Sequence, residues 1–209
     1  MLDAVADHVG WIDVFCEQGA FTVEESMRVL QAGQARGLGL RVHGNQIGHT
    51  GGAAMAVELG AASVDHLNFL SSEDIEMLAA SDTVATILPA CDLSTRAPLA
   101  PARELLDAGA TVAIASNLNP GTSYTSSVPF CITTAVLQQQ MTLAEAIRAA
   151  TLGGAVALRR TDVGHLSRSA PANFAVLDAP AAIHMAYRPG MVGVRATVKN
   201  GRIIAGALD

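Results

Sequence analysis

The chain alternates between short apolar runs and amphipathic stretches from residue 11 onward. This alternation is typical of βα units that build a parallel sheet. The apolar runs predict five strands, at residues 12–15, 39–43, 62–66, 83–88 and 111–115. The ends of the last four runs, at His43, His66, Leu88 and Ser116, are separated by 23, 22 and 28 residues. Each interval is close to the length of one strand, one helix and two loops, so the sequence predicts a regular βα repeat.

Three segments between or after these runs carry helix start signals. Thr22 is expected to be an N-cap, and Glu25 completes a capping box before an apolar stretch. Ser72, which two acidic residues follow, is expected to begin a helix in the same way. Thr142 with Glu145 predicts the start of a later helix.

The pattern changes after residue 126. Two successive helices are expected, at residues 127–139 and 143–157. Strand-like segments follow at 174–177, 194–199 and 202–204, and the last two are joined by Lys199-Asn200-Gly201, which is a hairpin signal. We therefore expect residues 161–209 to form a small β region apart from the βα units of residues 1–160.

Five parallel strands leave two architectures open. A closed (β/α)8 barrel has eight βα units and about 250 residues, with its functional residues at the C-terminal ends of the strands. The sequence supplies five such units. Either the sheet is open, or the chain is the C-terminal part of a TIM-like barrel whose first three strands precede Met1.

Composition and charge exclude several classes of protein. Half of the 209 residues are hydrophobic, so the chain can bury a substantial core. It has 13 basic and 19 acidic residues, a net charge of −6 without long charged runs, which argues against a nucleic-acid partner. No apolar run approaches the roughly 18 residues of a membrane span. Cys16, Cys91 and Cys131 lie in apolar surroundings and are expected to be reduced thiols, which predicts a cytoplasmic protein.

Two histidines end consecutive strand runs. His43 closes the second run and His66 closes the third, so both side chains are expected at the rim where βα loops build active sites. A single half-buried histidine is more often a packed structural residue, but two in equivalent places favour a site. Imidazole is a common ligand of zinc and iron, and a second histidine nearby can orient or protonate a substrate.

A loop with turn chemistry follows the fifth run. Its Asn-Pro-Gly-Thr core is compatible with a simple tight turn. Alternatively, Gly121 lets the backbone approach a ligand, while Asn119 and Thr122 supply amide and hydroxyl contacts. The second interpretation predicts a loop that binds an anionic substrate.

Several segments together resemble the imidazolonepropionases of the amidohydrolase superfamily. They are DVFCEQGAF at 13–21, RVHGNQ at 41–46, ELGAASVDHL at 58–67, ARELLDAGATVAIAS at 102–116 and NPGTSYTSS at 119–127. The resemblance implies a (β/α)8 barrel, here partial over residues 1–160, and a composite β-sandwich to which residues 161–209 contribute. It also implies a zinc or iron ion that activates water to open the ring of 4-imidazolone-5-propanoate, giving N-formimidoyl-L-glutamate.

The resemblance assigns a role to individual residues. His43 matches the family's metal-ligand histidine on the fifth barrel strand, and His66 matches the histidine on the sixth, close to the substrate. Asn119 and Gly121 match positions that hold the carboxylate end of the product. Thr122 matches a small hydroxyl residue that touches the imidazolone ring.

Two positions depart from the family pattern, and one motif is absent. Gln46 stands where the family has a glutamate suited to proton transfer, so it can hydrogen-bond to the substrate ring but cannot take up a proton. Asn117 stands at the position of the metal-binding aspartate of the eighth strand. The 209 residues also contain no His-x-His pair, which the superfamily carries on its first strand. Tight metal binding therefore needs ligands that this sequence does not supply.

Two other functions stay open. One is a non-catalytic remnant that dimerises and binds a small acid without converting it. The other is a different cyclic amidohydrolase or deaminase, which would use the same barrel. In every case we expect a small-molecule ligand and a homo-oligomer, because an open sheet exposes edge groups that proteins normally pair or cover.

Overall fold

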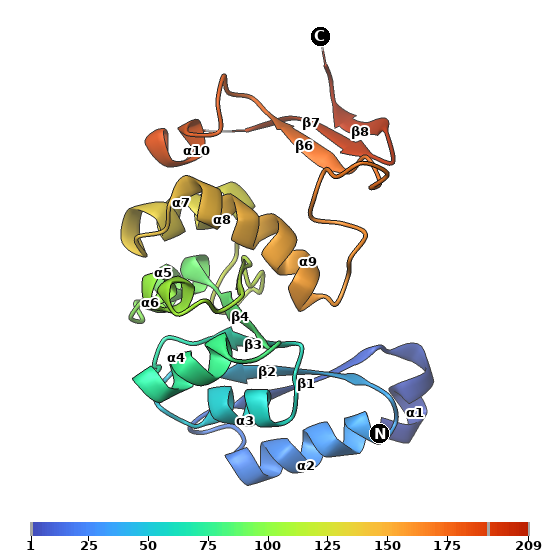
Figure 1. Ribbon diagram of the computed structural model, residues 1–209, viewed down its shortest axis with the longest axis vertical. Helices are drawn as coiled ribbons and strands as arrows, with labels where there is room; N and C mark the ends of the chain where they lie inside the picture. Colours follow the sequence, from blue (N-terminus) through green and yellow to red (C-terminus); the bar gives the residue numbers. More distant parts are fainter. Residues whose placement is uncertain (1, 192, 209) are drawn as a thin grey trace.

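The chain forms one five-stranded parallel sheet and one three-stranded antiparallel sheet, as the computed structural model in Figure 1 shows for residues 2–191 and 193–208. The parallel strands follow the order of the sequence, β1-β2-β3-β4-β5. They are β1 (Trp11–Cys16), β2 (Gly39–Gly44), β3 (Ser63–His66), β4 (Val84–Ile87) and β5 (Val112–Ile114). All neighbouring pairs are parallel, which confirms the predicted βα repeat.

The five strands form because their apolar runs can be buried on both faces. Every residue of β4 and of the edge strand β5 is buried, as expected for parallel strands covered by helices on their faces. β1, in contrast, alternates between exposed and buried positions. In the described part of the chain, no strand pairs with the outer edges of β1 and β5, so the sheet is open.

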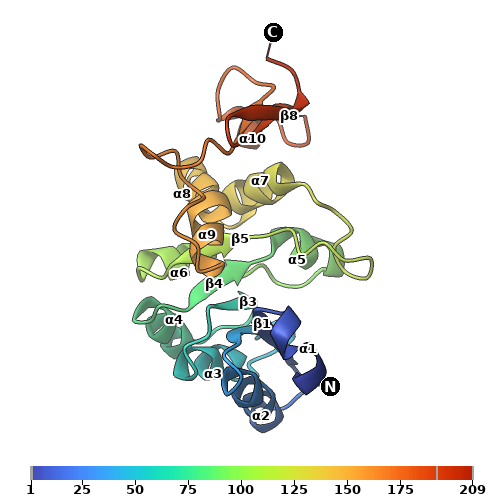
Figure 2. The same ribbon diagram turned by 90° about the vertical axis from the view of Figure 1, so that its right-hand side faces the viewer.

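The helices pack along the sheet in sequence order. Figure 2 shows α4 and α6 to the left of β4 and α5 to its right. Before the antiparallel sheet, the helices are α1 (Leu2–Val5), the 3-10 turn η1 (Ala6–His8), α2 (Val23–Gln34), α3 (Gly52–Glu58), α4 (Ser72–Ala79), α5 (Pro89–Thr95), α6 (Ala102–Asp107), α7 (Val128–Gln138), α8 (Leu143–Arg148), η2 (Ala149–Gly153) and α9 (Gly154–Ala157). In the described residues, no helix combines the length and the apolar character needed to cross a membrane.

The predicted helix starts are confirmed at two of three positions. Capping boxes join Thr22 to Glu25 and Thr142 to Glu145. The prediction at Ser72 is wrong by one residue. Ser71 is the N-cap, because only Ser71 stands three residues before Asp74, whose carboxylate accepts the Ser71 N–H at 3.0 Å.

The predicted helix at 143–157 contains a π-helical turn. The segment runs from α8 through η2 into α9, and η2 lies against β5. Gly153 ends the π turn, and a Cβ added there would lie 2.2 Å from the carbonyl oxygen of Val112. Glycine is therefore required at this position, since any side chain would push the helix away from β5.

The C-terminal residues form the predicted small β region. Strands β6 (Phe174–Leu177), β7 (Val194–Lys199) and β8 (Arg202–Gly206) pair antiparallel, and α10 (His184–Tyr187) packs on α7. Asn200 and Gly201 have φ of 49° and 75°, as a tight hairpin turn requires, which confirms the hairpin. In Figure 1 this sheet lies at the end of the molecule opposite α2, and no second sheet covers it within the described residues. The complete β-sandwich therefore stays a prediction.

Candidate active site

A groove of about 870 Å³ lies at the C-terminal ends of the parallel strands. It brings together six of the seven candidate residues, namely His43, Gln46, His66, Asn117, Asn119 and Thr122. Gly121 does not line the groove and is exposed to solvent. The three segments that the sequence singled out therefore converge at one rim.

The backbone takes left-handed conformations beside the groove, and two of the residues concerned, His66 and Asn117, line it. Asn45, directly after β2, and Asn117, three residues after the end of β5, have φ of 55° and 52°, a conformation that asparagine tolerates well. At the end of β3, His66 and Leu67 have φ of 86° and 63°. Such values cost non-glycine residues about 1–3 kcal/mol each and are concentrated at functional sites. The surrounding structure therefore holds His66 in a strained position at the rim.

Asp13 fixes the ring of His43. The two oxygens of Asp13 lie 2.9 and 3.1 Å from His43 Nδ1, which donates a hydrogen bond to the carboxylate. This hydrogen bond raises the pKa of His43, although burial opposes the rise. Because Nδ1 is engaged, Nε2 is the ring nitrogen that remains for a metal ion or substrate.

His66 lies beside His43 but is held neutral. The two ring centroids are 5.4 Å apart, and His66 is only 2% exposed. Burial, followed by the proximity of His43, lowers the pKa of His66 to about 4. At neutral pH, His66 is therefore an uncharged imidazole that can donate one hydrogen bond and accept another.

The Asn119 side chain is occupied within its own loop. Its oxygen accepts from the backbone N–H groups of Gly121 and Thr122 at 2.9 and 2.8 Å. Its amide donates to the carbonyl of Asn117 at 2.7 Å and to the Thr122 hydroxyl at 3.0 Å. Asn119 thus shapes the loop, and its predicted contact with a substrate carboxylate stays a prediction.

Four acidic or thiol side chains around the groove were missed from the sequence: Asp13, Glu17, Cys91 and Asp92. Asp13 interrupts an apolar strand run, and this interruption was a usable signal. Glu17 is buried and accepts the backbone N–H of Gln46. Cys91 and Asp92 lie in α5, whose first residue is Pro89. A proline at the first helical position is a helix-start signal, and it could have placed these two residues on a helix close to the end of β4.

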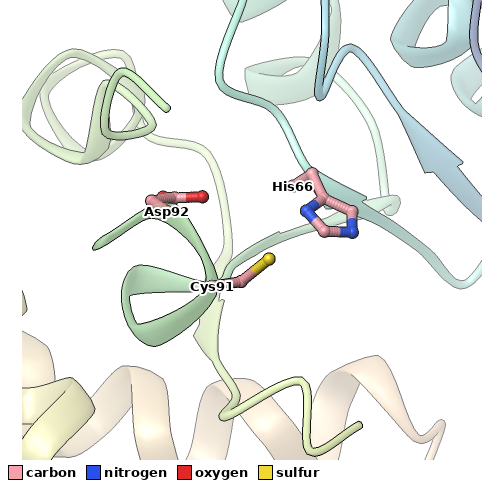
Figure 3. Close-up of side chains that lie close together, drawn as sticks. All are labelled: His66, Cys91 and Asp92. Carbon is pink, nitrogen blue, oxygen red and sulfur yellow. The ribbon is translucent and has the colours of Figure 1, made fainter. Parts of the chain in front are cut away.

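The predicted metal ligands do not by themselves form a suitable metal site. His43 and Asn117 offer one imidazole and one neutral amide, whereas zinc sites have three or four nitrogen, sulfur or carboxylate ligands. Within the described residues, the one cluster of three metal-binding side chains consists of His66, Cys91 and Asp92, drawn in Figure 3. This cluster contains neither His43 nor Asn117.

The sequence pattern that defines the amidohydrolase family matches residues 2–205 of the chain. The chain belongs to this family. Its five βα units and the groove at their C-terminal ends are therefore part of an amidohydrolase fold. The amidohydrolase resemblance that the sequence segments carried is confirmed.

Curated relatives of this amidohydrolase are imidazolonepropionases. The imidazolonepropionase of Saccharopolyspora erythraea is 66% identical over 91% of this chain and 50% of its own length. That of Micrococcus luteus is 59% identical over 97% of this chain and 54% of its own length. The chain thus spans about half the length of the curated relatives it matches.

Solved structures of other amidohydrolases share the fold. A 5-methylcytosine deaminase from Klebsiella pneumoniae, liganded with phosphonocytosine, matches with a TM-score of 0.80 at 18% identity, covering 100% of this chain and 59% of its own. An adenosine deaminase from Xanthomonas campestris with bound zinc matches with a TM-score of 0.75 at 18% identity, covering 90% of this chain and 50% of its own. At this identity the likeness concerns the fold alone.

Proposed function

We propose that the chain supplies one half of the active site of an imidazolonepropionase, which hydrolyses 4-imidazolone-5-propanoate to N-formimidoyl-L-glutamate. The observation that carries the proposal is the convergence of His43, His66 and the loop at 117–122 on one groove, in a chain 66% identical to an imidazolonepropionase. The groove volume of about 870 Å³ is in the range of small-molecule sites. A histidine-degradation enzyme with three free, buried thiols would work in the reducing cytoplasm.

In this proposal His43 is a metal ligand through Nε2, and Asp13 orients it. Zinc or iron, when bound, supplies Lewis-acid activation of water. Its remaining ligands would have to come from outside these 209 residues, because the chain has no His-x-His pair and Asn117 is neutral. The proposed role of this chain is therefore to orient the metal ligand His43 and to bind the substrate.

His66 and Gln46 are proposed to hydrogen-bond the substrate ring. Both line the groove, and neither carries charge at neutral pH when the pKa of His66 is about 4. The loop with Asn119, Gly121 and Thr122 is proposed to hold the carboxylate end. For this, at least one of the donors now engaged inside the loop has to turn toward the substrate.

Complementation tests this function. The purified chain would be mixed with the N-terminal half of the Saccharopolyspora erythraea relative, with zinc or iron added, and consumption of imidazolonepropanoate would be followed. We expect no turnover by the chain alone, turnover in the mixture, and its loss in His43→Gln. Asn117→Asp should increase turnover of the mixture, since it provides a carboxylate ligand.

The same assay separates the alternative functions. If no mixture and no metal give turnover, the chain is a non-catalytic remnant that binds a small acid at most. Turnover of a cyclic amidine nucleobase but not of imidazolonepropanoate would favour a deaminase, the activity named for two of the solved neighbours. Self-association through the open sheet edges is also proposed, and light scattering on the eluted chain measures it.

A further inference from the structure

A buried group of three side chains lies behind the groove, where β3 ends and α5 begins. One ligand atom from each of His66, Cys91 and Asp92 lies within 4.8 Å of the others. The three residues are 2%, 0% and 1% exposed. Figure 3 shows the Cys91 sulfur and the Asp92 carboxylate directed toward His66.

Two residues of this group, His66 and Asp92, have buried polar atoms without a well-formed hydrogen bond. Within the described part of the chain, both carboxylate oxygens of Asp92 and Nδ1 of His66 are buried without a hydrogen bond of good geometry, although Asn68 and the backbone of Ala100 lie close enough to Asp92 to oppose the rise that burial causes in its pKa. The Asn68 amide nearby donates instead to the carbonyl of Pro98. Buried polar groups without partners are rare, and each one suggests a bound water, an ion or a functional role. Because two such residues lie together, a bound ligand between them would explain both.

We propose that His66, Cys91 and Asp92 bind a zinc ion in this chain. Nitrogen, thiolate sulfur and carboxylate oxygen are the donor atoms that zinc takes in proteins. The ligand set excludes His43 and Asn117 but shares His66 with the proposed function, so the two proposals are tested at different residues, Cys91 and Asp92 here and His43 there.

The distances permit tetrahedral coordination after a small adjustment. With zinc bonds of about 2.0–2.3 Å, tetrahedral ligand atoms lie about 3.3–3.8 Å apart. The ligand atoms of the three residues now lie up to 4.8 Å apart, so they would have to approach one another by on the order of 1 Å. Rotation of the Asp92 carboxylate would provide this approach, in exchange for its contacts with Asn68 and the backbone of Ala100.

The charge balance also suits zinc. A thiolate and a carboxylate together neutralise a divalent ion, whereas either anion buried alone would be costly. His66 lines the groove, so the fourth position of the ion would be reached from the groove by water or a small ligand. Gln46, whose amide nitrogen lies 3.9 Å from Cys91 Sγ, stands beside this position.

Cobalt substitution tests the site with a readout that does not require activity. The full chain would be freed of metal with a chelator and titrated with Co²⁺. We expect one equivalent to bind and to produce a thiolate-to-cobalt charge-transfer band in the near ultraviolet. Cys91→Ser should abolish the band, while Cys16→Ser, which changes another buried free thiol, should retain it. Asp92→Asn should weaken binding by about tenfold or more, as loss of even a supporting group does.

The same measurements distinguish this site from the one in the proposed function. The band should survive His43→Gln, whereas turnover in the complementation assay should not. X-ray absorption on the zinc-loaded wild-type chain should show one sulfur at about 2.3 Å from the zinc ion. This measurement needs no variant, so it tests the site even if a substituted chain fails to fold. Absence of the sulfur, absence of stoichiometric metal, or a band that persists in Cys91→Ser would overturn the proposal.

Discussion

Two adjacent glycines in the helix over β5 should respond oppositely to the same substitution. Gly153 and Gly154 have helical backbone angles, φ −56° and −60°, so alanine fits the backbone at both positions. At Gly154 a Cβ meets nothing within 4 Å. Gly154→Ala should therefore stabilise the chain by about 0.5–1 kcal/mol, because alanine loses less conformational freedom on folding and is the better helix former.

At Gly153 the new Cβ would meet the backbone of β5. It would lie 2.2 Å from Val112 O and 3.2 Å from Ala113 Cα, and both are backbone atoms that cannot rotate away. Relief requires the π turn and β5 to separate by roughly 1 Å, the kind of overpacking that costs about 1–3 kcal/mol. The two variants should therefore differ in free energy of unfolding by about 1.5–4 kcal/mol.

Urea unfolding measures this difference directly. The fluorescence of Trp11, the one tryptophan, reports on the parallel sheet, and circular dichroism reports on the helices. The unfolding midpoint should fall in Gly153→Ala and rise slightly in Gly154→Ala, with similar slopes. Equal midpoints, or a higher midpoint for Gly153→Ala, would refute the close approach of the π turn to β5.

Two further predictions concern the loop and an ion pair. Asn119→Ala removes the oxygen that accepts the N–H groups of both Gly121 and Thr122. Hydrogen exchange of these two amides should therefore accelerate at least tenfold in this variant. Asn119→Asp keeps an acceptor oxygen, so it should leave the two amides protected. The hydrogen bond from the Arg103 guanidinium lowers the pKa of Glu145 to about 2, so the pair contributes stability above the ordinary glutamate pKa and loses it as the pH falls toward 2. Because both side chains are partly exposed, solvent screening keeps this contribution small. In Glu145→Gln, the drop in urea midpoint between pH 7 and pH 3 should be smaller than in the wild-type chain, and an unchanged drop would contradict this linkage.

The sheet was predictable because parallel strands covered on both faces are apolar throughout. The runs that end at His43 and His66 could therefore be read directly from the sequence. Their convergence on one groove followed from topology alone, since the C-terminal ends of parallel strands share one edge of a sheet. The capping boxes were predictable for a different reason, namely that a serine or threonine and an acid three residues apart interact locally.

What could not be predicted depends on contacts between distant segments. The Asp13–His43 pair joins residues 30 positions apart, and the π turn at Gly153 is needed only because β5 lies beneath it. The cluster of His66 with Cys91 and Asp92 also depends on how a short helix leaves β4. Asn119 shows a further limit, since its residue type suggested a free ligand group whereas the loop uses both ends of its amide.

The open edges of β1 and β5 determine what could complete the sheet. An eight-stranded ring needs three more strands, whereas a second copy of this chain would add five and bring the total to ten. Ring diameter grows with strand number, so a ten-stranded ring would hold the groove walls farther apart. Self-pairing and completion by a three-stranded segment would use the same backbone groups and exclude each other. In a refolding mixture, the yield of complemented protein should therefore fall as the concentration of this chain rises at a fixed concentration of its complement.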